Sequence, residues 1–223
     1  DSISISSDPT TTTAATFNSA QTWSDNSYVF REDSRGQEMI GIRAIVDDGT
    51  LGATFQNINR NTYPRWRGNV LGNSGTNRTL TLNLMQRSID NAAEMGNGEI
   101  DLIVGHLSIR REYINLLQPS VRYAPTKMMG GFELLSYNGG SGNTVVYFDK
   151  DADYNRFYFL DTSSLKIHRQ SDFEWADKDG SILSRISGQD AYDAFLVYYA
   201  ELGCDAPNRN SRLDDITVSD LIL

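Results

Sequence analysis

The chain has few of the residues from which catalytic and metal sites are built. Among its 223 residues are one cysteine, Cys204, and two histidines, His106 and His168. A single cysteine excludes an intrachain disulfide and is typical of a reducing compartment. The histidines lack metal-ligand spacing, and no G-x-S-x-G sequence supplies a nucleophile for them to activate. We therefore expect no catalytic residue, no metal and no cofactor, and we predict that the protein is not an enzyme.

The sequence also lacks a long apolar run. No stretch approaches the ~20 apolar residues of a membrane span. Residues 1–22 are rich in serine and threonine, whereas an export signal is basic and then apolar. We therefore expect no membrane partner and no export signal.

Only four of the 20 basic residues are lysines. The net charge of the chain is −9. An acidic chain without clustered cations is poorly suited to gripping phosphates, so we expect no sequence-specific nucleic acid partner. The 16 arginines suit planar ion pairs at interfaces. Compositional drift explains this bias equally well.

Residues 1–36 are polar and have few large apolar groups, which predicts an extended arm or an insertion. Within them, Ser2–Ser6 alternates with period two, as an edge strand does. After this segment the composition becomes that of a globular domain. Residues 39–50 predict a strand that ends in an Asp-Gly turn.

Residues 60–67 interleave arginines with Tyr63 and Trp66. Such a pattern occurs in nucleotide-stacking or glycan-binding platforms. It also occurs in structural loops where arginine packs on aromatic rings. We favour the structural loop because the chain as a whole is acidic.

Two helices are expected. The first covers residues 79–95, with Thr79 or Thr81 as its cap and Gly96 in the left-handed position that follows it. Its apolar face consists of Leu82, Met85, Ile89 and Ala92.

The second helix belongs to the unit Glu99–Tyr123, around which we expect the fold to be organised. Here a buried strand, Ile100–Val104, is broken by Gly105, and Ser108 caps the helix that follows. Pro119 ends that helix. Its apolar stripe consists of Ile109, Tyr113, Leu116 and Leu117.

After residue 125 the pattern predicts β-strands, within residues 132–139, 144–149, 156–161 and 164–169, then a long strand Ala194–Cys204 and a last one at Leu213–Val218. The acidic stretch Asp149–Asn155 resembles a calcium loop but has Tyr154 where that loop needs glycine, and Leu160 where it needs glutamate. We interpret it as an acidic turn.

Four segments resemble the major capsid proteins of tailed bacteriophages with the Hong Kong 97 fold. They keep the family's order and approximate spacing over residues 37–217. These segments are VDDGT with TYPRW (46–50, 62–66), DLIVGHLSIRREYINLLQPSVRY (101–123), YFLDT with LKIHR and DF (158–173), and QDA with AELGC and PNR (189–209).

The resemblance implies an α+β chain of the Hong Kong 97 type. It implies an axial domain of helices over a mixed sheet, at residues 37–160 with 207–223. The long β-strands of a peripheral domain would follow at 161–206, and 1–36 would be the polar arm or insertion. The family's usual N-terminal arm, extended loop and spine helix have no match in this sequence.

The function implied is that of a structural subunit of an icosahedral shell that encloses a packaged genome. Such a subunit is found in the virion and assembles in the host cytoplasm. Its partners would be other copies of itself, in pentamers and hexamers, together with scaffolding or decoration proteins. The candidate subunit-interface residues are Arg110, Arg111, Gln118, Arg122, Tyr123, Arg65 and Trp66.

Two alternatives stay open at this stage. The same fold builds the shells of encapsulin nanocompartments, which enclose enzymes instead of a genome. A glycan-binding β module would use Trp66, Tyr63 and the aromatic strands.

Overall fold

The computed structural model describes residues 3–6, 28–31, 39–117, 126–127, 133–138, 143–177 and 180–218. The chain divides into two compact units, Asp1–Met39 and Ile40–Leu223. In the first unit, strand β1 (Ile3–Ser6) pairs antiparallel with β2 (Tyr28–Arg31). The strand expected at the alternating Ser2–Ser6 stretch is therefore confirmed.

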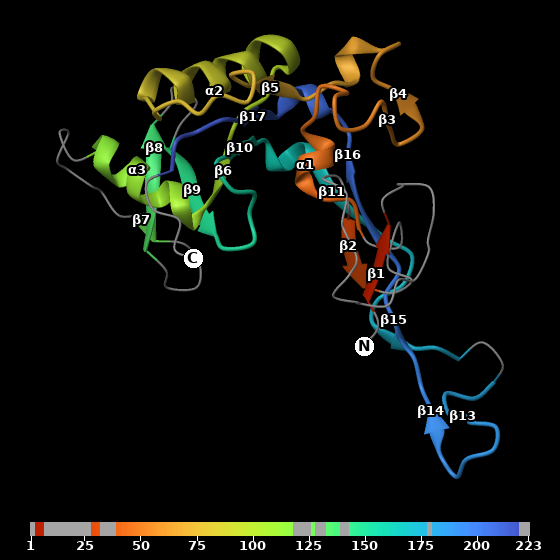
Figure 1. The fold of residues 1–223 in the computed structure, drawn as a ribbon. Helices are drawn as coiled ribbons and strands as arrows, with labels where there is room; N and C mark the ends of the chain where they lie inside the picture. Colours follow the sequence, from red (N-terminus) through yellow and green to blue (C-terminus); the bar gives the residue numbers. More distant parts are fainter. Residues whose placement is uncertain are drawn as a thin grey trace. The chain divides into compact units, whose positions relative to one another are not determined.

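The described part of the second unit contains a seven-stranded mixed sheet (Figure 1). Strand β17 runs parallel to β5, and β6 runs parallel to β9, while the other neighbours are antiparallel. In spatial order the strands are β5 (Asn69–Leu71), β17 (Ser211–Leu213), β10 (Phe157–Leu160), β6 (Leu102–His106), β9 (Asn143–Asp149), β8 (Glu133–Asn138) and β7 (Thr126–Lys127).

Helices α2 (Leu82–Gly96) and α3 (Leu107–Leu117) pack against this sheet and share one apolar core with it (Figure 1). Alternation along the central strands sends every second side chain to that core. The core is closed by Met85 and Ile89 of α2, Ile109 and Tyr113 of α3, and Ile103, Val146, Phe157, Phe159 and Leu213 of the sheet. An α+β arrangement of helices over a mixed sheet is thus present.

Helix α2 is confirmed, although it begins at Leu82 and not at residue 79, and the Thr81 hydroxyl accepts the Leu84 N–H at 3.2 Å as its cap. The left-handed residue that follows is Asn97, with φ +53°, and not Gly96 as expected. Gly96 is needed for another reason, because a Cβ there would lie 2.6 Å from the backbone of Asn208. Tertiary contact, and not the helix end itself, selects this glycine.

The start of α3 also differs from the prediction. Strand β6 runs through Gly105 to His106, and a Cβ on Gly105 would meet the Phe157 ring at 2.6 Å. The side chain that caps the helix is His106, whose Nδ1 accepts the Ser108 N–H at 3.0 Å. The predicted apolar stripe is confirmed, since Ile109 and Tyr113 are fully buried.

The segment 39–50 is not the strand that we expected. It contains a short helix, α1 (Ile42–Ile45), which packs on the other face of the sheet. Its core there comprises Ile45, Val46, Phe55, Tyr158, Leu160 and Cys204. Strands β3 (Thr54–Phe55) and β4 (Ile58–Asn59) follow, then the 3-10 turn η1 (Pro64–Trp66).

From residue 165 the chain forms a nested antiparallel hairpin that we call the ribbon, Leu165–Cys204. Within it β11 pairs with β16, β12 with β15 and β13 with β14. These strands are β11 (Leu165–Arg169), β12 (Glu174–Trp175), β13 (Ser184–Arg185), β14 (Tyr192–Asp193), β15 (Leu196–Val197) and β16 (Ala200–Cys204). The predicted long strand Ala194–Cys204 is divided, because the N–H groups of Gln170 and Ser171 both reach the carbonyl of Tyr199.

Two 3-10 turns flank the ribbon, η3 (Thr162–Ser164) before it and η4 (Pro207–Arg209) after it. The last strand of the sheet, β17, covers Ser211–Leu213 and ends where the predicted strand Leu213–Val218 begins, so only Leu213 is shared. In the part of the chain that the structure describes, no helix is both long and apolar enough to cross a membrane.

Candidate assembly surface

The two predicted interface residues of the 60–67 loop lie in different environments. Trp66 is partly buried, its indole N–H donates to the Phe55 carbonyl at 3.1 Å, and its ring stacks on Phe55. Arg65 and Tyr63 are exposed. The Arg60 guanidinium also lies over the Phe55 ring, 4.9 Å from its centre. This packing agrees with a structural loop and leaves Arg65 and Tyr63 as its surface.

Buried arginines fix this loop beneath the sheet. Arg60 and Arg212 each donate to two carbonyls at the end of α1, at 2.8–3.3 Å. A helix leaves its last four carbonyls without intrahelical partners, so these guanidinium groups satisfy all of them. The carbonyls belong to Arg43, Ala44, Ile45 and Val46.

Asp47 lies close to both arginines, and Asp214 also pairs with Arg212 at 3.0 Å. Asp47 is fully buried, with Oδ2 3.4 Å from Arg60 Nη1 and Oδ1 3.8 Å from Arg212 Nη2. Burial lowers the pKa of the Arg60 guanidinium, and the Asp47 carboxylate acts in the opposite direction. The loop is therefore held by charges that water does not reach.

Helix α3 presents two further predicted residues to solvent. Arg110 and Arg111 are exposed, while Ile109 and Tyr113 face the core. Gln118, Arg122 and Tyr123 lie outside the described residues. The structure thus describes four of the seven candidates, and three of those four are exposed.

Sequence reasoning missed the exposed apolar surface of the ribbon. Between Leu165 and Leu202 no described residue is buried. Nine large apolar side chains of the ribbon are exposed: Ile167, Phe173, Trp175, Ile182, Leu183, Tyr192, Phe195, Leu196 and Tyr199. The aromatic strands were visible in the sequence, but nothing in them indicated that their side chains would be exposed.

One side of the ribbon gathers much of this apolar surface. Cross-strand partners share a face, so Trp175 lies beside Leu196, and Ile167 lies beside Leu202. The Phe173 ring stacks on Tyr198, with centroids 4.4 Å apart and planes 12° apart. If alternation continues past the irregularity at Gln170 and Ser171, these residues share one side, which we call the apolar face: Ile167, Phe173, Trp175, Leu196 and Tyr198. The other side holds Lys166, His168, Glu174 and Glu201.

The base of the ribbon is anchored by a buried polar cluster. Asn210 donates to the Ser164 hydroxyl at 2.9 Å and accepts the Asp161 N–H at 2.9 Å. The Cys204 thiol lies 3.8 Å from the same hydroxyl, and burial raises its pKa. Arg209 completes the cluster with a 2.7 Å ion pair to Asp161. The ribbon is therefore fixed where it leaves the sheet.

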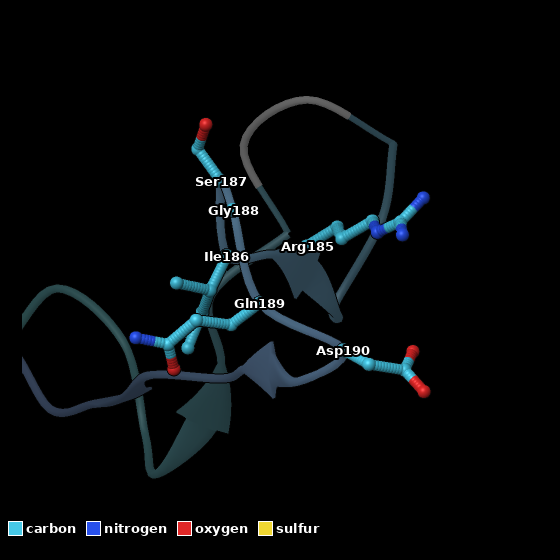
Figure 2. Close-up of a pocket in the computed structure, with 6 residues that line it drawn as sticks. All are labelled: Arg185, Ile186, Ser187, Gly188, Gln189 and Asp190. Atoms are coloured by element: carbon cyan, nitrogen blue, oxygen red, sulfur yellow. The ribbon is translucent and has the colours of Figure 1, made fainter.

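A hollow of about 470 Å³ lies at the far turn of the ribbon, lined by the consecutive residues Arg185–Asp190. Figure 2 shows that the polar ends of Arg185, Ser187 and Asp190 point away from one another. A binding site for a small molecule needs polar groups that converge on one point. This turn does not provide them.

Two other places were candidates for chemistry. His106 Nδ1 lies 2.7 Å from the Ser108 hydroxyl, but it also accepts the Ser108 N–H, so the pair forms the cap of α3. In the stretch Asp149–Asn155, Asp149 accepts the Asp151 N–H at 2.9 Å, as an acidic turn does. Among the described residues, no group of three or more His, Cys, Asp or Glu could hold a metal ion.

Comparison with solved structures places the fold. The chain superposes on a subunit of the cyanophage A-1(L) capsid with a TM-score of 0.51 and 20% sequence identity. The fold is that of Hong Kong 97-type shell proteins. The match covers 74% of this chain and 56% of the capsid chain, so this chain spans little more than half the length of that relative.

Two further likenesses are weaker. The encapsulin complex of Synechococcus elongatus gives a TM-score of 0.48 at 9% identity, covering 74% of this chain and 61% of that one. The virus-like particle of Pyrococcus furiosus gives 0.35 at 12% identity, covering 64% and 56%. Neither is close enough to carry an argument. No protein-family model matches the chain, and no curated protein sequence matches it.

Proposed function

We propose that this chain is a structural subunit of an icosahedral bacteriophage capsid that encloses the packaged genome. The observation that carries the proposal is the likeness of its fold to the cyanophage capsid subunit. The four sequence segments that resemble tailed-phage capsid proteins point to the same class. The virion is then its location, and the host cytoplasm its place of assembly.

The ribbon supports self-association. A two-stranded hairpin is at best marginally stable in water unless a further layer covers it. Contiguous exposed apolar patches of several hundred Å² mark sites of protein contact in soluble proteins. The ribbon carries nine exposed large apolar side chains on an anchored base. Its partners in our proposal are other copies of the chain, in pentamers and hexamers, joined by scaffolding or decoration proteins.

The domain division follows the resemblance. We assign residues 37–160 with 207–223 to an axial domain and 161–206 to the β part of a peripheral domain. The return of the chain into the sheet as β17, next to β10 and β5, supports this division. Arg110, Arg111 and Arg65, on the surface of the axial part, are the described candidates for contacts around its symmetry axes.

The protein acts in this proposal without catalysis and without a cofactor. The hollow at the ribbon turn has no converging groups, and the Ser108–His106 pair serves as a helix cap. A glycan-binding module would depend on Trp66, but the indole N–H of this residue donates to the Phe55 carbonyl.

Electron microscopy of the purified chain, with sedimentation across micromolar concentrations, tests the proposal. We expect rings or closed shells of defined symmetry. A chain that stays monomeric throughout would contradict it. Nuclease treatment then separates two kinds of shell. Shells isolated from the producing cells should protect DNA, whereas shells filled with protein alone would favour an encapsulin-like compartment.

A further inference from the structure

The apolar face of the ribbon continues the core of the molecule onto its surface. At the base, Leu165, Leu202 and Cys204 pack into the core around α1. Further out the same side carries Ile167, 57% exposed, then Phe173 at 71% and Leu196 at 57%. A stripe that is buried at one end and bare at the other indicates a surface that is completed by something else.

Most charged side chains of the paired strands β11, β12, β15 and β16 lie on the other side of the ribbon. That side holds Lys166, Glu174 and Glu201, whereas the five residues of the apolar face include no ionisable carboxylate or amine. The cation on the apolar side is Arg169, opposite Ala200, and it is paired with Asp172 at 2.6 Å. Copies of a chain with net charge −9 repel one another, so they meet most easily on a surface where the nearby Asp172 carboxylate is already paired with Arg169.

We propose that two copies of this chain pack the apolar faces of their ribbons against each other. An isologous contact of this kind lets the same patch serve on both copies. Each ribbon then covers the exposed apolar side chains of the other one. The proposal deepens the proposed function, on which it rests for the self-association of the chain, by naming the face through which copies meet.

The area is sufficient for such a contact. Three aromatic and two aliphatic side chains, about half exposed, offer on the order of 500 Å² on each copy. A pair of faces would then bury roughly 1,000 Å², the lower bound for a specific interface. Trp175 and the Phe173–Tyr198 stack supply the aromatic anchors that usually dominate such contacts.

Adjacent residues of β15 provide a matched test. Leu196 lies on the apolar face opposite Trp175, and Val197 lies on the other side opposite Glu174. Leu196→Lys and Val197→Lys therefore introduce the same charge one residue apart, on opposite sides. We expect Leu196→Lys to weaken the dimer, measured by sedimentation velocity, by roughly tenfold or more, and Val197→Lys to change it little.

Thiol labelling measures whether the apolar face is covered in the dimer, without introducing a charge that disrupts the dimer contact. The native Cys204 is buried, so Leu196→Cys and Val197→Cys each add one accessible thiol. As concentration rises, labelling at position 196 should slow in step with dimer formation, while labelling at 197 should not. Circular dichroism of each variant confirms that it is folded.

Three outcomes would overturn the inference. They are a chain that stays monomeric, an association that both lysine variants weaken equally, and protection of position 196 in a monomer, which would mean that another part of the same chain covers the face. If shells still form with Leu196→Lys, the ribbon contact is contradicted and the proposed function is supported. If a dimer depends on Leu196 but never yields rings or shells, the ribbon contact is supported and the proposed function is contradicted.

Discussion

Strand β10 and the strands of the ribbon are built from the same kinds of residue but have opposite surroundings. All four residues of β10, Phe157–Leu160, are buried. The ribbon strands also carry aromatic and aliphatic residues, among polar and charged ones, but the described part of the ribbon has no buried residue between Leu165 and Leu202. Composition alone therefore does not decide what is inside. The number of layers around a strand decides it.

The difference has a structural cause. β10 lies between β17 and β6, with one helical core on one face and the α1 core on the other. Each ribbon strand has one hydrogen-bonded neighbour. Apolar burial contributes ~25 cal/mol per Å², so most of the folding free energy comes from the sheet. The ribbon depends on its anchored base and on whatever covers it.

The largest expected effect comes from one substitution made in both regions. Phe157→Ala removes a fully buried ring from the centre of the sheet and should lower the free energy of unfolding by about 3–5 kcal/mol. Phe173→Ala removes a ring that is 71% exposed and should cost at most about 1 kcal/mol, mainly the stack on Tyr198. Urea unfolding followed by circular dichroism measures both. Equal costs would mean that the ribbon is part of the cooperative core.

Arg60→Gln should cost nearly as much, about 3 kcal/mol, although it leaves the apolar core unchanged. The substitution leaves the Asp47 carboxylate short of one counter-charge and removes donors from two carbonyls of α1. Arg169→Gln is the matched control on the ribbon, where the ion pair with Asp172 is exposed and contributes ~0–1 kcal/mol. A small cost for Arg60→Gln would show that Arg212 holds α1 alone.

A smaller loss of stability is expected from crowding the contact between the end of α2 and the turn η4, which follows the ribbon. A Cβ on Gly98 would lie 2.2 Å from the Arg209 carbonyl oxygen, so Gly98→Ala should cost about 1–3 kcal/mol. Gly52→Ala is the control, because nothing lies closer than 3.9 Å to its Cβ position. Thermal unfolding of the two variants compares them. Equal midpoints would mean that this contact yields without strain.

The smallest effect concerns pH. Burial raises the pKa of the Cys204 thiol in the folded protein, so the unfolded chain ionises first as pH rises. Above about pH 8.5 the folded state therefore loses stability until the folded thiol ionises too. In that pH range the wild type should therefore lose unfolding free energy relative to Cys204→Ala, so the difference between the two proteins should depart from its value at neutral pH. A constant difference, or rapid thiol labelling at neutral pH, would contradict a buried thiol.

Much of the sheet and its helices could be predicted from local patterns. The stripe Ile109/Tyr113 and the Thr81 cap are set by residues within a few positions of one another, and both are confirmed. Segment 39–50 was predicted as a strand because isoleucine and valine favour strands. It is helical at α1, whose carbonyls are bound by Arg60 and by the distant Arg212. Sequence spacing does not reveal such a partner.

The candidate surface was predictable only in part. Arg65, Arg110 and Arg111 are exposed, as interface residues must be, and their role stays a prediction. Trp66 has an internal hydrogen bond that no pattern of residues indicates. Two stretches of the ribbon were predicted as strands, residues 164–169 and Ala194–Cys204, whereas β12, β13 and β14 were not. The exposure of the ribbon side chains depends on what packs against them, and local sequence patterns do not show that.

The position of β17 bears on how the chain folds during synthesis. This strand sits between β5 and β10, yet it lies near the end of the sequence, about 140 residues after β5. On the ribosome the sheet cannot close until residues 211–213 have emerged, and by then the whole ribbon is already outside the exit tunnel. Closing contacts so distant in sequence is slow, and a bare apolar hairpin invites aggregation in the meantime. A cell that makes many copies of this chain must keep the nascent ribbons apart, through chaperones or through the rate of translation, until the final strand locks the sheet.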